Sequence, residues 1–458
     1  MALEKVLQHI DDELDAALAR LDGFLRIPSI STDPAYSEDV ARAADWLVGT
    51  LNDIGFSAER HDTLGHPMVV SPPMGADGPH VKFYGHYDVQ PVDPLELWES
   101  DPFDPQIIDT PKGKIIRARG TADDKGQLMT FVEACRAWKT VTGTLPIRVS
   151  LFFEGEEESG SPSLIPYLED HKDDLHSDLV LICDTGMVTP ETPSIVTMLR
   201  GMVSQEVTIT GADVDLHSGF FGGTARNPIH VLATALAGLH DETGRVTLPG
   251  FYDNVRDVPE TVAQQWQDLP FDGDGFLNAV GLSVPAGETG RSVLEQTWAR
   301  PTAEVNGIWG GYTGDGFKTV IPSKASAKVS FRLVAGQDPD QVAKAFKDHV
   351  RAHLPPDCSA AFADFSHAAA SSFDISLPAF EKARRVLSEE WGAPAAFVGC
   401  GGSIPIAGHF QSLIGTEPML IGFGQDDDGL HSPNEKYDLR SFHKGMRSWA
   451  RILDALSE

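Results

Sequence analysis

The chain has 458 residues and a formal net charge of −31, from 67 acidic and 36 basic residues. A chain of this length is longer than one hydrophobic core usually organises, which indicates two domains. Its acidic character does not favour nucleic acid or an anionic membrane surface as a partner. Its four cysteines show no C-x-x-C spacing, no apolar run reaches the ~18 residues of a membrane span, and the start is unlike a signal peptide, so we expect a soluble cytoplasmic protein.

Helical and strand-like segments alternate over residues 1–198. Helical spacing occurs over residues 38–54, 125–140 and 163–175. Short apolar runs predict strands over residues 80–84, 147–153 and 179–183. This alternation predicts an α/β domain with a mixed, mostly parallel sheet and helices on both faces.

The pattern changes over residues 199–375, which we expect to form an inserted α+β lid and dimerisation domain. Strands are predicted at 203–210 and 327–334 and helices at 228–239 and 339–354, whereas residues 257–316 are rich in Gly, Pro and acidic residues and are assigned no regular structure. The α/β pattern returns over 376–458, with helices at 378–391 and 441–456 and a strand at 419–423. The catalytic domain is therefore expected to be discontinuous, formed by residues 1–198 and 376–458.

Five short segments carry side chains that bind divalent metals. They are G-H-Y-D-V-Q-P with His86 and Asp88, G-T-A-D-D-K-G with Asp123, E-G-E-E-E-S-G-S with Glu157 and Glu158, L-I-C-D-T with Asp184, and G-L-H-S-P-N-E with His431. Several of these residues directly follow predicted strands, where open α/β sheets bind ligands. Two imidazoles and three carboxylates would suit two zinc ions, with one carboxylate left to bridge them.

Each segment also has an ordinary structural interpretation. His86 or His431 alone could be a loop residue, and Asp123 or Asp124 could cap the following helix. The acidic run 156–158 could be a solvated loop, although three adjacent carboxylates repel one another unless a cation or a proton intervenes. Asp88, two residues beyond His86, could orient its imidazole. The coincidence of all five segments favours the metal site.

In this order the segments resemble the dinuclear zinc peptidase and acylase family that includes carnosinase, cytosolic non-specific dipeptidase, carboxypeptidase G, acetylornithine deacetylase and succinyl-diaminopimelate desuccinylase. The resemblance implies that His86 and Asp184 bind one ion, that Glu158 and His431 bind the other, and that Asp123 bridges both. It assigns Glu157 as the general base, gives Glu156 no role, and implies a cis peptide between Asp123 and Asp124. Two Zn²⁺ per subunit are expected, with Mn²⁺ or Co²⁺ as substitutes.

Further motifs are similar to those of the dipeptidase branch. D-L-H-S-G contains His217, which resembles a family histidine that reaches an oxyanion in the partner subunit's site and so implies a homodimer. Thr319, Arg332, Gly402 and Ser403 match the dipeptidase pattern, and the guanidinium of Arg332 and the backbone of Gly402 and Ser403 are suited to holding a free substrate carboxylate. A cross-strand ion pair for Arg332 and a tight turn at residues 401–402 remain open as alternatives. Cys400 departs from the carnosinase pattern, which has Glu before the two glycines.

The resemblance predicts a dinuclear metal-dependent hydrolase that cleaves the amide bond of dipeptides or short peptides with a free C-terminal carboxylate. A metal-bridging water activated by Glu157 would attack the carbonyl, and Asp88 and His217 would assist. An N-acyl amino acid deacylase on the same site is the alternative. A third hypothesis, a binding protein without activity, conflicts with the intact Glu157. We also expect the inserted domain to close on substrate.

Overall fold

The computed structural model describes residues 2–402 and 404–458, which divide into two compact units. The first unit comprises residues 1–197, 373–398 and 409–458, and the second comprises residues 198–372 and 399–408. The short segment 399–408 thus lies with the second unit, whereas the sequence division assigns it to the last catalytic segment. Hydrogen bonds from Arg200 to the backbone of Gly401 and Gly402 hold it there.

The first unit is built on a mixed sheet whose central strands are parallel. In order across the sheet, its strands are β1 (Glu59–His61), β2 (Met68–Met74), β6 (Arg148–Glu154), β3 (His80–His86), β7 (Leu179–Ile182), β17 (Pro418–Leu420) and β8 (Ser194–Leu199). The central strands β6, β3, β7 and β17 run parallel, and the outer strands are antiparallel to their neighbours.

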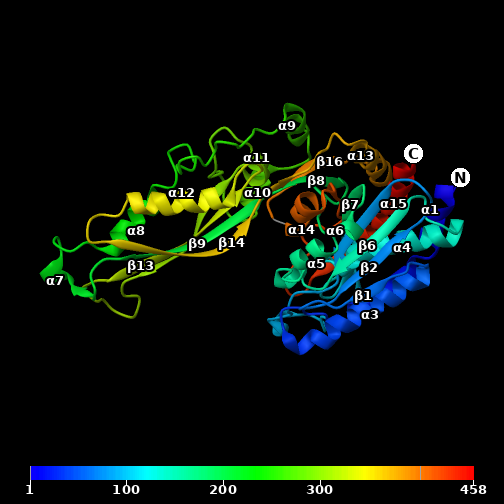
Figure 1. Ribbon diagram of the computed structural model, residues 1–458, viewed down its shortest axis with the longest axis horizontal. Coiled ribbons are helices and arrows are strands. Elements are labelled where there is room, and N and C mark those ends of the chain that lie inside the picture. Colours follow the sequence, from blue (N-terminus) through cyan, green and yellow to red (C-terminus); the bar gives the residue numbers. More distant parts are fainter. Residues whose placement is uncertain (1, 403) are drawn as a thin grey trace. The chain divides into compact units, whose positions relative to one another are not determined.

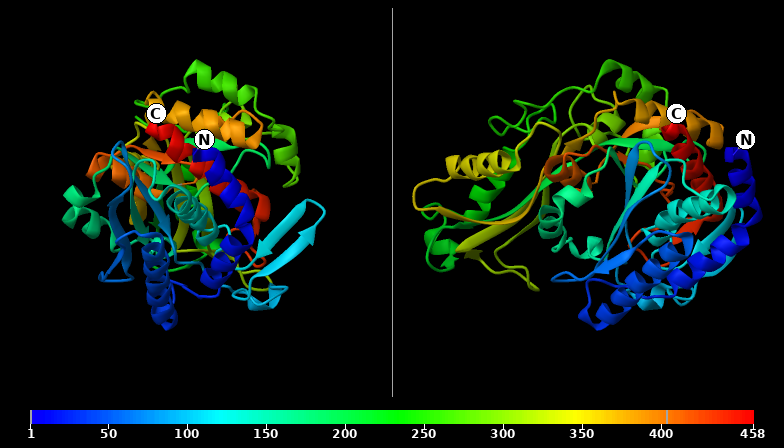
Figure 2. Two further views of the ribbon diagram at one scale, coloured as in Figure 1. Left: turned by 90° about the vertical axis from the view of Figure 1, so that its right-hand side faces the viewer. Right: turned by 45° about the vertical axis from the view of Figure 1, so that its right-hand side comes forward.

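Helices cover both faces of this sheet. Successive side chains of β3 point to opposite sides, so they pack against helices on each face. Phe83 packs against Phe131 and Trp449, while Tyr84 packs against Phe410 on the other face. The helices of this unit are α1 (Ala2–Asp12), α2 (Leu14–Leu25), α3 (Ser37–Ile54), α4 (Lys125–Thr142), α5 (Leu164–Asp170), α6 (Lys172–Leu175), α13 (Pro378–Trp391) and α15 (Leu439–Ser457). Helices α1 and α15, at the two chain ends, lie side by side in Figure 1 and Figure 2. The predicted α/β fold is confirmed.

Most predicted elements of the first unit agree with the structure to within a few residues. The predicted helix over 163–175 is wrong as one element, because His171 leaves the helical backbone conformation between α5 and α6. A three-stranded sheet of β18 (Lys436–Asp438), β5 (Gly113–Arg117) and β4 (Gln106–Thr110) was not predicted. It joins the segment after His431 to the segment before Asp123.

The second unit contains an antiparallel sheet in the order β11 (Thr302–Gly310), β13 (Lys324–Leu333), β9 (Gly201–Thr210) and β14 (Ser359–Ala368). Helices α8 (Pro228–Ala237) and α12 (Pro339–Ala352) pack on one face and bury an apolar core with it. At one end of the unit, the short strands β10 (Leu216–His217) and β12 (Val320–Ile321) pair next to α7 (Ser218–Phe221). Figure 1 labels α7 at this end. Short elements at the unit boundaries are β15 (Ser371–Ser372), β16 (Ala396–Cys400) and α14 (Pro405–His409).

The absence of regular structure predicted for residues 257–316 is wrong. This segment contains α9 (Glu260–Gln267), α10 (Gly273–Asn278), α11 (Val293–Trp298) and strand β11. Local caps start two of these helices: Asp272 accepts from the backbone of Gly275, and Ser292 forms a capping box with Glu295. Among the described residues, no helix is both long and apolar enough to cross a membrane.

Candidate metal centre

The five candidate ligands, although far apart in the chain, converge within the first unit. The Nε2 atom of His86 lies 3.1 Å from Oδ1 of Asp123 and 3.9 Å from Oδ2 of Asp184. The Nε2 atom of His431 lies 3.0 Å from the other oxygen of Asp123 and 3.4 Å from Oε2 of Glu158. Two groups of three side chains therefore share Asp123, and within each group the potential ligand atoms lie within 4.8 Å of one another.

Strand ends bring these residues together. His86 is the last residue of β3 and pairs in register with Glu154, the last residue of β6. Glu157 and Glu158 follow in a single helical turn, and Asp184 comes two residues after β7. Because β3, β6 and β7 are parallel, their carboxyl ends lie at one edge of the sheet.

Asp88 organises this edge through both its backbone and its side chain. Its carbonyl oxygen lies 3.2 Å from Nδ1 of His86, and its carboxylate accepts the backbone N–H groups of Glu157 at 3.3 Å and Glu158 at 3.0 Å. Asp88 is fully buried. It therefore fixes the imidazole and the acidic turn relative to each other, a broader role than orienting His86 alone.

The environment of His86 fits a bound cation. If Nδ1 carries the proton and donates to the Asp88 carbonyl, Nε2 presents a lone pair toward the oxygens of Asp123 and Asp184. The buried Nε2 atom makes no hydrogen bond of acceptable geometry to any described residue. The lone pair of Nε2 would then face carboxylate oxygens that also carry lone pairs. A divalent cation bound between them would remove this repulsion. A nitrogen and carboxylate donor set is also one that zinc accepts.

Charge crowding shifts the pKa values of these carboxyl groups. Burial, followed by the negative charge of Asp123, raises the pKa of Glu158 to about 8 and that of Asp184 well above its usual range. Burial also raises the pKa of Glu157. For Asp123, burial is outweighed by the hydrogen bond from His431 and by the neighbouring imidazole of His86, which lower its pKa. A shared cation would favour the ionised form of all four groups.

Asp124 occupies the N-cap position of α4 but makes no capping hydrogen bond with its side chain. Its carboxylate instead accepts the backbone N–H of His86 at 3.2 Å. The helix-capping interpretation of this acidic pair is therefore not supported by the contacts. The peptide bond between Asp123 and Asp124 is cis, which confirms the expectation from the resemblance.

The candidate substrate-binding residues belong to the second unit and form two groups there. His217 and Thr319 are exposed and lie together at the two-stranded β10–β12 sheet, where the Ser218 N–H donates to the Thr319 carbonyl. Arg332 lies near the other end of β13, and Gly402 accepts a hydrogen bond from the backbone N–H of Arg200. Ser403 lies outside the described residues.

The contacts of Arg332 do not support the ion-pair interpretation. Its cross-strand neighbours are Met202 and Thr302, neither of which is acidic. It forms no ion pair with any described residue. Arg200, whose pKa is lowered to about 10 by burial and then by the charge of Arg332, adds a second guanidinium nearby.

The motifs themselves contain residues with contacts that the sequence did not reveal. Gln90, in G-H-Y-D-V-Q-P, donates to Oε2 of Glu158 at 2.6 Å. Glu435, in G-L-H-S-P-N-E, is fully buried beneath the Asp123 loop. Arg200 has no motif signal at all. The sequence around each of these three residues does not reveal its hydrogen-bond partners, because those partners lie far away in the chain.

Comparison with known proteins assigns the family. The model of the family described as Peptidase family M20/M25/M40 matches residues 82–455 of this chain. Cys-Gly metallodipeptidase dug1 of Schizosaccharomyces pombe is 31% identical, over 100% of this chain and 99% of the relative. The human Beta-Ala-His dipeptidase is 29% identical, over 98% of this chain and 91% of the relative. The solved structure of human carnosine dipeptidase 1 aligns with a TM-score of 0.80 and 28% identity, over 100% of this chain and 99% of that one.

The fold and the convergent nitrogen and oxygen donors define a metal-dependent hydrolase. The chain belongs to the M20/M25/M40 peptidase family, and the resemblance stated from its motifs is confirmed.

Proposed function

We propose that the chain is a dinuclear zinc dipeptidase that hydrolyses dipeptides with a free C-terminal carboxylate. The dipeptidase activity follows from family membership and from relatives named as dipeptidases over nearly their whole lengths. The observation that carries the dinuclear centre is the pair of ligand groups joined by Asp123. His86 and Asp184 would hold one ion, and Glu158 and His431 the other. Mn²⁺ or Co²⁺ would be active substitutes.

When bound, the ions would supply Lewis-acid stabilisation of the developing oxyanion and make water more acidic. Glu157 would accept the proton of the attacking water and pass it to the leaving amine. Its carboxylate is half-buried, has a raised pKa and makes no hydrogen bond to any described residue, so it is free to exchange a proton. The Asp88 hydrogen bond to the Glu157 N–H would hold the turn that presents this base.

The substrate carboxylate would be bound by Arg332 and the backbone at Gly402 and Ser403, with Thr319 nearby in the assembled site. A guanidinium with no acidic partner suits this task, since charge-assisted hydrogen bonds to a carboxylate are strong. Dipeptides such as Cys-Gly and β-Ala-His, after which the relatives are named, are the first substrates to test. N-acyl amino acid hydrolysis is not favoured, because these relatives are named as dipeptidases.

The geometry of the second unit supports a homodimer in which His217 serves the partner subunit. Strand β13 runs from Lys324, next to the β10–β12 sheet that holds His217, toward Arg332, so about 26 Å of strand separates Lys324 from Arg332 at ~3.3 Å per residue. An extended dipeptide spans only ~7 Å. One chain therefore cannot place both side chains on one substrate, and His217 would act on a substrate held by another copy.

The test is Glu157→Gln combined with a substrate panel. We expect zinc-dependent turnover of dipeptides by the wild type and a loss in kcat of about 10²–10⁴-fold in the variant, the usual contribution of a positioned general base. Zinc binding, measured by metal analysis, should be retained. Full turnover by the variant would refute the role of Glu157. Turnover of only N-acetyl or N-succinyl amino acids would refute the dipeptidase assignment.

A further inference from the structure

The side chain of Glu435 lies beneath the loop that carries Asp123. Its carboxylate is fully buried and accepts the backbone N–H groups of Gly120 at 2.9 Å, Ala122 at 2.9 Å and Asp123 at 3.2 Å. Arg119 donates to the same carboxylate at 2.8 Å. Several N–H groups converging on one anion form a nest that fixes the backbone conformation around it. The loop 119–123 is thus wrapped around Glu435.

Arg119 extends this connection to the loop that follows His86. Its guanidinium is buried, and its second terminal nitrogen donates to the carbonyl of Pro91 at 2.9 Å. It also lies 5.4 Å from the centre of the Trp98 ring. Through Arg119, the Glu435 carboxylate therefore contacts two of the loops that carry proposed ligands.

Glu435 also fixes the third loop, because it follows His431 by four residues. His431 and Asn434 both adopt left-handed backbone conformations, with φ of 61° and 66°. Such conformations are costly for residues other than glycine and persist only where surrounding contacts hold them. Asn434 is held by the Glu99 N–H at 2.8 Å and by the Leu97 carbonyl at 2.9 Å, and Glu435 by the nest.

We propose that Glu435 is a positioning residue that locks the His431 loop to the Asp123 loop, so that both ligand groups of the metal centre form together. The proposal rests on the dinuclear centre proposed above. Glu435 lies behind Asp123, which it holds by the backbone N–H, and so leaves the Asp123 carboxylate free for ligands. Groups that orient metal ligands in this way commonly contribute about 10–100-fold to metal affinity.

The test compares the zinc affinity of the Glu435→Gln variant with that of the wild type, measured by competition with a fluorescent chelator, together with the number of ions bound. Glutamine keeps the shape but offers an N–H₂ group where two donors already point, so the nest must open on one side. We expect affinity to fall about 10–100-fold and the rise in Tm on adding zinc to shrink. Glu435→Asp, which keeps the charge but shortens the reach, provides a second variant if the first does not fold.

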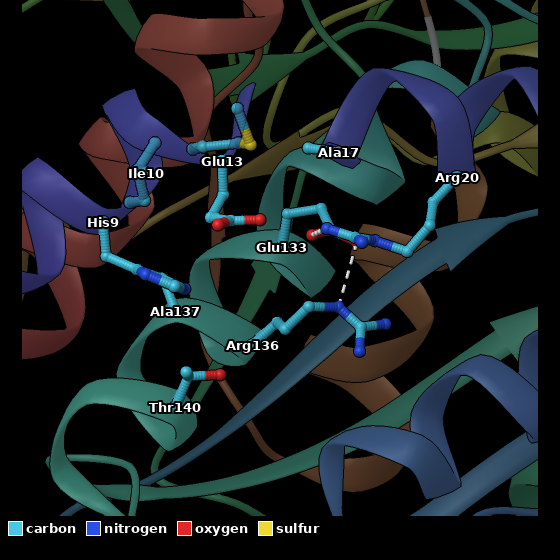
Figure 3. A pocket seen from close by; sticks show the side chains of 10 residues that line it. His9, Ile10, Glu13, Ala17, Arg20, Glu133, Arg136, Ala137 and Thr140 are labelled. Atoms are coloured by element: carbon cyan, nitrogen blue, oxygen red, sulfur yellow. Dashed lines mark hydrogen bonds and ion pairs between the residues drawn. The ribbon is translucent and has the colours of Figure 1, made fainter. Parts of the chain in front are cut away.

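Glu133→Gln is the matched control. Glu133, on α4, is also a buried glutamate in an ion pair, with Arg20 at 2.6 Å and Arg136 at 3.3 Å. It lines a pocket between α1, α2, α4 and α15 that contains none of the proposed ligands (Figure 3). This control should lower Tm without changing zinc affinity. Unchanged affinity in both folded Glu435 variants, or an equal loss in the control, would overturn the proposal.

The same measurements separate this proposal from the proposed function. A wild type that binds two ions but cleaves no dipeptide would refute the substrate and leave the Glu435 result valid. A wild type that binds no zinc would refute both.

Discussion

The two units differ in how completely each one assembles its candidate functional residues. In the first unit, His86 is fully buried, Asp123 is nearly so, and both have positions fixed by neighbours such as Asp88 and Glu435. In the second unit, His217 and Thr319 are exposed, and Arg332 has no ionic partner among the described residues. The first set is preorganised by its own unit. The second set has few fixing contacts within its own unit.

This difference indicates separate tasks. A metal centre gains from rigid ligands, because a pair of ions tolerates little variation in distance. Residues that recognise substrate must stay accessible until it arrives. Because His217 and Arg332 are far apart along the second unit, the proposed function implies that a complete site would need two copies of the chain.

The largest expected effect tests that consequence by mixing two inactive variants. His217→Ala and Arg332→Ala should each lose most activity as pure dimers, since an oxyanion donor alone contributes about 10²–10³-fold. After co-refolding in equal amounts, activity should recover to about a quarter of the wild-type value, because about half of the dimers are mixed and each mixed dimer has one intact site. The measurement is turnover of a dipeptide before and after mixing.

Mixing two preparations of the same variant provides the control and should restore nothing. Recovery confined to the mixed sample, together with a dimeric mass in solution, would support action of His217 across subunits. Failure of the mixed dimers to recover activity, with dimer exchange verified by tagged subunits, would show that His217 does not act across subunits and would contradict the proposed assembly.

A smaller effect is expected for Arg332→Lys, which tests the open guanidinium of the second unit. Lysine keeps the charge but cannot make the two-pronged contact with a carboxylate, so KM for a dipeptide should rise about tenfold while kcat changes little. The same substrate with an amidated C-terminus should be poor for the wild type and no worse for the variant. An equal loss on both substrates would mean that Arg332 does not bind the carboxylate.

The sequence predicted most of the metal centre because its ligands occur where strand ends coincide with metal-binding residue types. His86 and Asp184 illustrate this, since an apolar run followed by a ligand residue identifies both the strand and its functional end. Glu435 could not be predicted. A glutamate in a polar loop normally faces solvent, and its burial depends on the loop 119–123, which lies more than 300 residues away in the chain.

The second unit was predicted less well because composition obscured local signals. Residues 257–316 contain many glycines and prolines, yet the capping box of Ser292 and Glu295 is enough to start α11. Strand β11 is an edge strand with largely exposed side chains, so its sequence lacks the regular apolar alternation of β9. Where burial is partial, periodicity is weak, and pairing with β13 decides the structure.

The smallest expected effect concerns the pH dependence of stability at the two ends of β3. Burial lowers the pKa of His80 to about 4, from 6.5, so its contribution is present above pH 6.5 and is lost as pH falls through 4. Burial raises the pKa of Glu158, beyond the other end, to about 8 from 4.5, so its contribution is present below pH 4.5 and is lost as pH rises through 8. The metal-free protein should therefore have its highest Tm between about pH 4 and about pH 8.

Zinc should change this profile, because zinc binds the ionised carboxylate. The zinc-induced rise in Tm should grow from pH 6 to pH 8.5, measured by calorimetry with and without the metal. His80→Gln should flatten only the acid side, and Glu158→Gln only the alkaline side and the zinc effect. A zinc effect independent of pH would show that the carboxylates at this edge do not titrate with metal binding.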